Sequence, residues 1–485
     1  MKNFMTGLDA VVFGLLDSGV KIVTGVPGFP ITEVMDALPG KIKHEWSVNE
    51  KVALEVALGS SVCGERSAVI TKHVGMNILA DPLVSSATHT IGAGVVIIAG
   101  DDPGVQKSQN EQDSRYFGLV AEVPVFDPSK PDTAYRCIKE AFLLSEGTST
   151  PVIIRVTDRL LKSKSEIIRK SATGSGIPDF DRKIWLLTML GKHQRFHKYS
   201  FPKMCEYSEK SNLNSYIKRG DIGIISSGYP SSLVESVIND NISHISLQII
   251  NPLPKELVDS FINNHVRVLV VEETEPVIER QLTKRVLGKL TGHLPFGIIE
   301  VKDIMEAIEK INDDKVESNV IPQQIKERGA RPLCKDCPYL PLYDAIKELD
   351  VPVAGDVGCS ILASSPPLSV IDAAFSLGSS VGTASGFNRK GIAIIGDFGL
   401  AHSGIAGIIN AVHNKHDLLV IVLQNEVSAM TGGQAVPDLT ELISFYVKDT
   451  TLIDPQADNL KDLLDMKLKT NGVSVILARA RCPQF

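Results

Sequence analysis

Residues 391–434 read GIAIIGDFGLAHSGIAGIINAVHNKHDLLVIVLQNEVSAMTGGQ. The run 391–395 is continuously apolar, which is typical of a strand buried on both faces, and it ends at Asp397. A Ser- and Gly-rich turn and a helical pattern follow, and a second apolar run, Leu418 to Leu423, ends at Asn425. Two buried strands joined by a helix predict a doubly wound α/β fold with a parallel sheet.

The polar residues at the two strand ends predict a ligand site. If the two strands are neighbours, the side chains of Asp397 and Asn425 converge at the carboxyl edge of the sheet. A carboxylate and an amide oxygen beside a helix N-terminus suit a Mg²⁺ ion that carries a diphosphate. Gly-Asp after a strand can also be a simple turn, but Asn425, 28 residues later, favours the metal site.

Composition excludes several classes of protein. The chain has 485 residues, and 50 Lys and Arg against 57 Asp and Glu give a net charge of −7, which argues against general nucleic-acid binding. No apolar run approaches the roughly 18–20 residues that span a bilayer, and the N-terminus does not resemble a signal peptide. The seven thinly spread Cys suit reduced thiols or metal ligands. We expect a cytoplasmic, multidomain protein without a membrane segment.

The patterning divides the chain into four segments. Residues 1–160 and 221–315 each alternate apolar runs with helical patterns, and a third α/β block occupies residues 316–485. Residues 161–220 hold 13 Lys and Arg against 5 Asp and Glu, and we interpret them as a linker or insert. Their charge indicates either a solvated surface or a docking surface for an acidic partner. The strands expected before residue 300 are Val20–Thr24, Ala68–Thr71, Val95–Ala99, Val152–Val156, Ile222–Ser226, Ile245–Ile250 and Val266–Val271.

The stretch from Gly396-Asp397 to Asn425 resembles the diphosphate-binding signature of thiamine diphosphate enzymes. Its continuation, AMTGGQ at 429–434, resembles the 2-oxoacid:ferredoxin oxidoreductases, and especially the large subunit of the indolepyruvate type. Further matched motifs follow in family order: VPGFP at 26–30, KHVGMN at 72–77, DDPG at 101–104, SQNEQD at 108–113, GDVGC at 355–359 and HSG at 402–404. The resemblance covers most of the chain.

The resemblance implies a thiamine diphosphate-binding fold. Residues 1–160 would be the pyrimidine-binding domain and 316–485 the diphosphate-binding domain, each with a doubly wound parallel sheet. A transketolase C-terminal-like α/β domain, residues 221–315, would lie between them in the sequence.

The resemblance also implies roles for single residues. Glu50 matches the glutamate that contacts N1′ of thiamine diphosphate, although on sequence grounds alone it could simply be a carboxylate at a helix N-terminus. His73 and His402 lie in matched motifs, where they either transfer protons or line the pocket. The expected cofactor-binding residues are Pro27, Gly28, Gly396, Asp397, Asn425, Val427, Met430 and Thr431, of which Asp397, Asn425 and Val427 would hold Mg²⁺.

Four cysteines match the positions that hold a [4Fe–4S] cluster in the resembling enzymes: Cys334, Cys337, Cys359 and Cys482. Each iron of such a cluster takes one thiolate. Structural zinc also uses four thiolates, and unligated thiols are a third possibility. The remaining Cys63, Cys137 and Cys205 suit unligated thiols.

The reaction implied is the oxidative decarboxylation of an aryl (indolepyruvate-like) or branched 2-oxoacid with coenzyme A, which yields acyl-CoA and reduces ferredoxin. Phe29 replaces the usual threonine of the family turn, so it either favours an aromatic or apolar substrate or simply packs. The sequence ends without the ferredoxin-like C-terminal domain of the family. We therefore expect a hetero-oligomer with a smaller subunit that contains the γ domain and with ferredoxin or a ferredoxin-like subunit.

Two other functions remain open at this point. One is a non-oxidative thiamine diphosphate-dependent decarboxylase or carboligase, which would not need the four cysteines. The other is a catalytically silent assembly subunit that keeps the fold without turnover.

Overall fold

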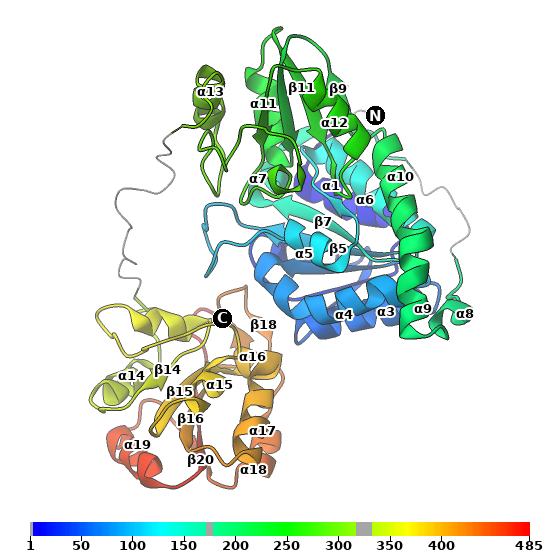
Figure 1. Ribbon diagram of the computed structural model, residues 1–485. Helices are drawn as coiled ribbons and strands as arrows, with labels where there is room; N and C mark the ends of the chain where they lie inside the picture. Colours follow the sequence, from blue (N-terminus) through cyan, green and yellow to red (C-terminus); the bar gives the residue numbers. More distant parts are fainter. Residues whose placement is uncertain (1–2, 171–177, 317–331) are drawn as a thin grey trace. The chain divides into compact units, whose positions relative to one another are not determined.

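Sheets flanked by helices build both of the units into which the chain divides, Met1–Gln324 and Ile325–Phe485 (Figure 1). The computed structural model describes residues 3–170, 178–316 and 332–485. Residues 317–331, at the start of the third predicted α/β block, lie outside the described residues.

The first unit contains a seven-stranded sheet in the order β12-β6-β7-β5-β4-β2-β3. Its strands are β2 (Ile22–Gly25), β3 (Lys43–Trp46), β4 (Ser67–Lys72), β5 (Val95–Asp101), β6 (Val125–Phe126), β7 (Val152–Thr157) and β12 (Ile249–Asn251). All neighbours pair in parallel except β12. Alternate residues of β4 enter two cores, because Ala68 and Ile70 face one helical layer and Val69 faces the other. The strands expected within 1–160 are confirmed.

Helices cover both faces of this sheet. They are α1 (Gly7–Asp17), α2 (Thr32–Asp36), α3 (Glu50–Val62), α4 (Met76–His89), α5 (Arg115–Ala121) and α6 (Pro131–Thr148). Helices α1 and α6 pack together on one face, whereas α3 and α4 pack together on the other (Figure 1). This arrangement leaves the carboxyl ends of β2, β4 and β5 at one edge, where ligands bind in open parallel sheets.

A four-stranded sheet, in the order β13-β10-β11-β9, completes the first unit. Its strands are β9 (Ser215–Ile217), β10 (Ile222–Ser227), β11 (Ile242–Leu247) and β13 (Arg267–Val271), with helices α11 (Tyr229–Val237), α12 (Lys255–Asn263) and α13 (Val301–Glu309). The prediction of one strand at Ile245–Ile250 was wrong. The apolar run changes sheets at Gln248, and Ile249 pairs antiparallel with Phe126 of β6. The Gln248 side chain stabilises the crossing, because it accepts a hydrogen bond from Ser129 N (3.0 Å) and donates one to Ser246 Oγ (2.8 Å).

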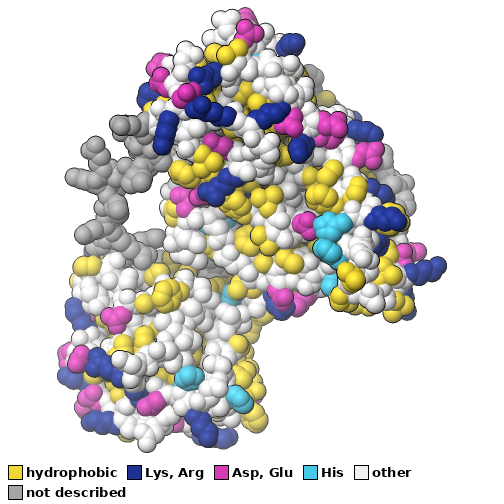
Figure 2. Space-filling view, viewed as in Figure 1, with side chains coloured by type: hydrophobic (Ala, Val, Ile, Leu, Met, Phe, Trp, Pro, Cys, Tyr) yellow, Lys and Arg dark blue, Asp and Glu magenta, His cyan; other side chains and the backbone are white. Residues whose placement is uncertain are grey.

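The segment 161–220 is largely helical in its described part. It contains the end of α7 (Asp158–Lys162), β8 (Lys164–Ile167), α8 (Arg182–Trp185), α9 (Met189–Arg195) and α10 (Phe201–Lys210), and a π-helical turn joins α9 to α10. Strand β8 pairs with β1 (Asn3–Thr6), and α10 packs on α6 and α12, so the segment belongs to the first unit. Figure 2 shows hydrophobic and histidine side chains together on the face formed by α8 and α9. Leu186 and Leu190 are exposed there.

The second unit is a five-stranded parallel sheet in the order β14-β15-β16-β20-β19. Its strands are β14 (Val353–Ala354), β15 (Gly391–Gly396), β16 (Leu418–Gln424), β19 (Thr450–Ile453) and β20 (Val473–Arg479), and a hairpin of β17 (Val427–Ser428) and β18 (Gln434–Ala435) extends from β16. Its helices are α14 (Leu340–Lys347), α15 (Ser380–Ser385), α16 (Asp397–Gly399), α17 (Ile405–His413), α18 (Thr440–Tyr446) and α19 (Leu460–Lys469). Strands β15 and β16 are adjacent, as predicted.

The prediction of a Ser- and Gly-rich turn after Asp397 was wrong. The chain is helical from Asp397 to His413, and this helix includes a π-helical turn at Leu400–Gly404. The glycines there serve packing rather than a turn. A Cβ on Gly399 would lie 2.1 Å from Asp356 Oδ2, and one on Gly404 would lie 2.4 Å from Ile395 Cδ1. Across the described ranges, no helix combines the length and apolar character that a bilayer crossing requires.

Two fully buried arginines connect the two sheets of the first unit. Arg115 donates hydrogen bonds to Asp113 (2.6 Å) and Glu272 (2.9 Å), and Arg155 donates to Asp101 (2.6 Å) and to Thr274 (3.1 Å), which follows β13. Burial opposes the guanidinium charge, but the two neighbouring carboxylates outweigh burial and raise the pKa of Arg115. The network thus fixes the second sheet on the edge of the first one.

Replacing Arg115 with Met should destabilise the protein by about 3–5 kcal/mol, because it leaves Asp113 and Glu272 buried without their counter-ion. Thermal and denaturant unfolding would measure the loss. The control is Lys210→Met, which breaks the exposed Lys210–Glu206 pair and should change stability by less than about 0.5 kcal/mol. Equal effects of the two substitutions would contradict the stabilising role of the network.

Candidate functional site

Asp397 and Asn425 meet at the carboxyl edge of the second unit's sheet. Gly396 is opposite Leu423 in the register of β15 and β16, so the two residues follow directly on neighbouring strands. The Asp397 carboxylate accepts hydrogen bonds from the backbone N–H groups of Asn425 (3.0 Å) and Glu426 (2.6 Å). The predicted convergence of these two residues is therefore present in the structure.

The environment of Asp397 favours a cation. The side chain is 7% exposed, and burial raises the pKa of Asp397 to about 6, although backbone N–H donors partly oppose this shift. Asp397 is also the first residue of the helix that continues to α17. An aspartate and an asparagine oxygen at this position form a donor set that suits Mg²⁺, while the helix N-terminus suits a phosphate group.

The β17–β18 hairpin places three further predicted residues beside this edge. Val427 donates its N–H to Asn425 Oδ1 at 3.2 Å, which ties the start of the hairpin to the side chain of Asn425. Thr431 bonds to Ser428 Oγ (2.7 Å) and Gln434 Oε1 (2.9 Å), so its hydroxyl stabilises the hairpin itself. Met430 is exposed and is the apolar side chain that the hairpin offers to a ligand.

Asp356 is a site residue that was not predicted. It follows β14 and is 2% exposed, and its carboxylate accepts hydrogen bonds from the N–H groups of Gly378 (2.7 Å) and Ser379 (3.0 Å). Burial raises the pKa of Asp356 to about 7. Asp356 follows a strand, as Asp397 does, and that position was the signal by which Asp397 was predicted. The strand before Asp356, β14, has only two residues and cannot be recognised as an apolar run.

His402 lies close to this second carboxylate. It is 4% exposed, its Nδ1 is 3.1 Å from Ser403 Oγ, and it lies close enough to Asp356 to oppose the rise in the pKa of that carboxyl group. The side chain is thus part of the buried polar layer under the sheet edge, and its predicted role in catalysis stays a prediction.

The four predicted cysteine ligands lie near one another in the second unit. Burial raises the pKa of Cys359 to about 11, and the other three thiols, those of Cys337, Cys482 and Cys334, add to the shift. Tyr339 connects the Cys-x-x-Cys turn to the end of β20, because its hydroxyl donates a hydrogen bond to the carbonyl oxygen of Ala480 (3.0 Å).

The four thiols could serve either a single metal ion or an iron–sulfur cluster, and the two demand different arrangements. Within residues 3–170, 178–316 and 332–485, no group of three or more His, Cys, Asp or Glu side chains is placed to hold a metal ion. A [4Fe–4S] cluster makes a different demand, since its four thiolates bind four separate irons. Four neighbouring thiols fit that demand in type and number.

The first unit presents Glu50 at the edge of its own sheet. Glu50 is the first residue of α3 and is 6% exposed, and Asn49 caps the helix by accepting a hydrogen bond from Val52 N (2.9 Å). The carboxylate packs on Gly75, where a Cβ would lie 2.3 Å from Glu50 Oε1. Only glycine at position 75 leaves Glu50 this space.

His73 is fully buried at the same edge, directly after β4. Its two ring nitrogens are 3.3 Å from Gly100 O and 3.2 Å from Asn110 O. A neutral imidazole can donate to only one of these carbonyls. These contacts show His73 holding the loop that follows β5, and a role in proton transfer stays a prediction.

The Pro27-Gly28-Phe29 turn follows β2 at this edge. Pro27 and Gly28 are buried, whereas Phe29 is partly exposed, and the ammonium group of Lys107 is 4.8 Å from the centre of the Phe29 ring. The aromatic ring is thus in contact with a cation as well as accessible from outside.

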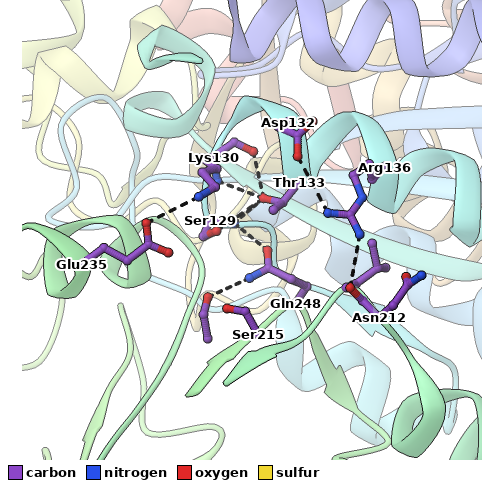
Figure 3. A pocket seen from close by; sticks show the side chains of 11 residues that line it. Ser129, Lys130, Asp132, Thr133, Arg136, Asn212, Ser215, Glu235 and Gln248 are labelled. Atoms are coloured by element: carbon purple, nitrogen blue, oxygen red, sulfur yellow. Dashed lines mark hydrogen bonds and ion pairs between the residues drawn. The ribbon is translucent and has the colours of Figure 1, made fainter. Parts of the chain in front are cut away.

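A pocket of about 200 Å³ elsewhere in the first unit contains none of the predicted site residues. It lies where the start of α6 meets the four-stranded sheet (Figure 3). Its charged residues pair with each other, Lys130 with Glu235 at 3.4 Å and Arg136 with Asp132 at 3.8 Å. These charged groups of the pocket lining therefore already have ion-pair partners within the lining.

Comparisons with known proteins agree with this geometry. The N-terminal TPP binding domain of thiamine pyrophosphate enzymes matches residues 5–116, which include Glu50. The C-terminal TPP binding domain matches residues 356–462, which include Asp397 and Asn425. The indolepyruvate oxidoreductase subunit IorA of Methanothermobacter thermautotrophicus is 34% identical over 481 residues, which cover 90% of this chain and 77% of that protein. The chain belongs to the IorA family of indolepyruvate oxidoreductase subunits.

The IorA subunit of Archaeoglobus fulgidus is 30% identical and covers 99% of this chain and 86% of its own length. A solved structure, the 2-oxoglutarate:ferredoxin oxidoreductase from Magnetococcus marinus with 2-oxoglutarate, coenzyme A and succinyl-CoA bound, has a TM-score of 0.52 at 16% identity, over 64% of this chain and 65% of that one. This likeness shows the fold. The predicted thiamine diphosphate-binding fold and the resemblance to the large subunit of the indolepyruvate oxidoreductases are confirmed.

Replacing Gly75 with Ala should displace the Glu50 carboxylate, because the new methyl group would lie 2.3 Å from Glu50 Oε1 and from Thr71 Oγ1. We expect turnover by the complete enzyme to fall about 100-fold if Glu50 has its predicted role, because a displacement of about 1 Å within a site can cost that much. Gly59→Ala in α3 is the matched control, since a Cβ there meets nothing within 4 Å. If Gly75→Ala were as active as Gly59→Ala, Glu50 would not depend on this contact.

Proposed function

We propose that this chain is the large subunit of an enzyme that oxidatively decarboxylates an aryl 2-oxoacid. The 2-oxoacid and coenzyme A would be converted to acyl-CoA, carbon dioxide and one proton, while two ferredoxins each gain one electron. The observation that carries this proposal is the meeting of Asp397 and Asn425 at the same sheet edge that carries four neighbouring cysteines. A diphosphate site beside an electron-transfer centre is what this reaction requires.

Thiamine diphosphate, when bound, would supply the electron sink for decarboxylation. Each unit would supply its own cofactor-binding residues. Asp397, Asn425 and the carbonyl group of Val427 would bind Mg²⁺, and Gly396 would let the diphosphate approach the helix N-terminus. Glu50 would bind the pyrimidine ring and hold a proton at its carboxylate.

The buried position of Glu50 supports that role. Glu50 is 6% exposed, so water has little access to its carboxylate. A proton shared between this carboxylate and the pyrimidine ring would therefore not be lost to water. Pro27 and Gly28 would line the same end of the cofactor, since their turn lies at the same edge of the first sheet.

The electrons would leave through a [4Fe–4S] cluster bound by Cys334, Cys337, Cys359 and Cys482. Their mutual proximity supports this assignment, and so does the burial of Cys337 and Cys359, which shields a cluster from water. A non-oxidative decarboxylase would have no use for such a set. The cluster gives the oxidative reaction a one-electron route to ferredoxin.

Phe29 would select the substrate. Its partly exposed ring, held by Lys107, offers an apolar surface to an aryl or branched side chain. A smaller subunit with the γ domain and a ferredoxin or ferredoxin-like subunit would complete a hetero-oligomer, in keeping with the family's description as an oxidoreductase subunit.

Replacing Glu50 with Gln should reduce ferredoxin-linked turnover of an aryl 2-oxoacid at least about 100-fold, because the amide cannot take a proton. The anaerobically purified complex should still retain thiamine diphosphate, measured by thiamine analysis, since Gln keeps the shape and a hydrogen bond. The control is Glu55→Gln on the exposed face of α3. Wild-type turnover in Glu50→Gln would refute the assignment of Glu50.

Replacing Cys337 with Ser should remove the visible absorbance of the cluster and lower the iron and sulfide content of the anaerobically purified complex. Cys63→Ser changes an exposed thiol outside the set and should leave the cluster intact. Zinc in place of iron and sulfide in the parent protein would show that the site is a structural zinc site. A full cluster signal in Cys337→Ser would show that the ligands are different.

A further inference from the structure

Lys72 is a half-buried lysine at the carboxyl end of β4, beside the predicted cofactor residues of the first unit. Its aliphatic chain crosses the Pro27-Gly28 turn so closely that a Cβ on Gly28 would lie 3.0 Å from Lys72 Cβ and 3.1 Å from Lys72 Cδ. Gly28 therefore makes room for this side chain. The ammonium group ends at the carbonyl oxygen of Lys107, 3.3 Å away.

The ammonium group of Lys72 forms no ion pair in the part of the chain that the structure describes. The acid that acts on it is Asp102, whose carboxylate is already engaged with the N–H groups of Gln106 (3.1 Å) and Lys107 (2.9 Å) and with the Ser108 hydroxyl (2.5 Å). A half-buried ammonium group whose hydrogen-bond partner is one carbonyl oxygen at 3.3 Å has donors left for a further anion.

A second cation adds to the positive field at this point. Asp102 caps the loop that follows β5, and this cap positions Lys107, whose ammonium group contacts the ring of Phe29. Lys72, Lys107 and Phe29 thus form a small cluster with two positive charges and one apolar ring. An anion with an aromatic or aliphatic side chain matches that combination.

We propose that Lys72 binds the carboxylate of the 2-oxoacid substrate, and that the Phe29 ring contacts the substrate's side chain. This inference rests on the proposed function. It assigns to Lys72 the recognition of the acid, which distinguishes a 2-oxoacid from the corresponding aldehyde or ester. Lys107 acts through Phe29 as a positioning residue.

Burial supports this role, since it lowers the pKa of Lys72 to about 8, with Asp102 opposing the shift. Substrate binding would then require the protonated lysine. The other titratable groups on the elements around it are Lys107 on the loop after β5, His73 next in the chain and Glu50 at the start of α3. We expect kcat/KM of the parent enzyme to fall as the pH rises through about 8, because the free enzyme loses the ammonium charge.

Three variants of the anaerobically purified complex test the proposal, with phenylpyruvate, coenzyme A and ferredoxin. Lys72→Met should raise KM for phenylpyruvate at least about 30-fold, the loss expected for one partner of a buried charge pair, and change kcat much less. Lys72→Gln, which keeps the bond to the Lys107 carbonyl, should show the same loss if Lys72→Met fails to fold. Lys72→Arg should retain a low KM and extend activity to higher pH, since the guanidinium stays charged.

The control is Lys162→Met, which removes an exposed charge and should leave KM unchanged. Calorimetric binding gives a readout besides turnover: the parent should bind phenylpyruvate in preference to its neutral methyl ester, and Lys72→Met should lose that preference. If Lys72→Met kept the parent's KM and preference, the inference would be wrong while the proposed function stood. If the parent complex neither bound nor oxidised any 2-oxoacid, the proposed function itself would fail.

Discussion

Two backbone hydrogen bonds to the Asp397 carboxylate hold the functional edge of the second unit together. They come from the N–H groups of Asn425 and Glu426, at the end of the neighbouring strand. Strands β15 and β16 are almost wholly buried and apolar, so polar groups can gather only where the strands end. Because Gly396 is opposite Leu423 in the register of the two strands, Asp397 and Asn425 must lie close together. The start of the following helix and the β17–β18 hairpin are both built on this contact.

The order of the strands extends the same constraint across the sheet. Cys359 follows β14, Asp397 follows β15, Asn425 follows β16 and Cys482 follows β20, which are successive neighbours in the sheet. Adjacent strands are about 4.8 Å apart, so all four ends lie within roughly 15 Å of one another. The fold therefore brings the proposed magnesium ligands and two of the four proposed cluster ligands to one edge, while the Cys-x-x-Cys turn before α14 would supply the other two.

The sequence predicted correctly those strands whose burial on both faces is visible in their own residue pattern. The runs that became β15 and β16 could be recognised because a strand covered on both faces must be apolar throughout. The run through Ile249 looked the same, yet it changes sheets, since its partner β6 is far away in the sequence. Asp356 was missed for a related reason. Its significance comes from the fit against Gly399, a contact between distant parts of the chain that no local pattern contains.

The functional edges of the two sheets differ in the sign of the ionisable groups whose charge burial disfavours. In the second unit, burial raises the pKa of Asp356 and Asp397, so that edge gains stability from a cation. In the first unit, burial lowers the pKa of Lys72, so that edge gains stability from an anion, even though Glu50 lies on the same side of the sheet. A magnesium-bound diphosphate would satisfy the first need, and a carboxylate would satisfy the second. Each edge would thus favour a group of opposite charge.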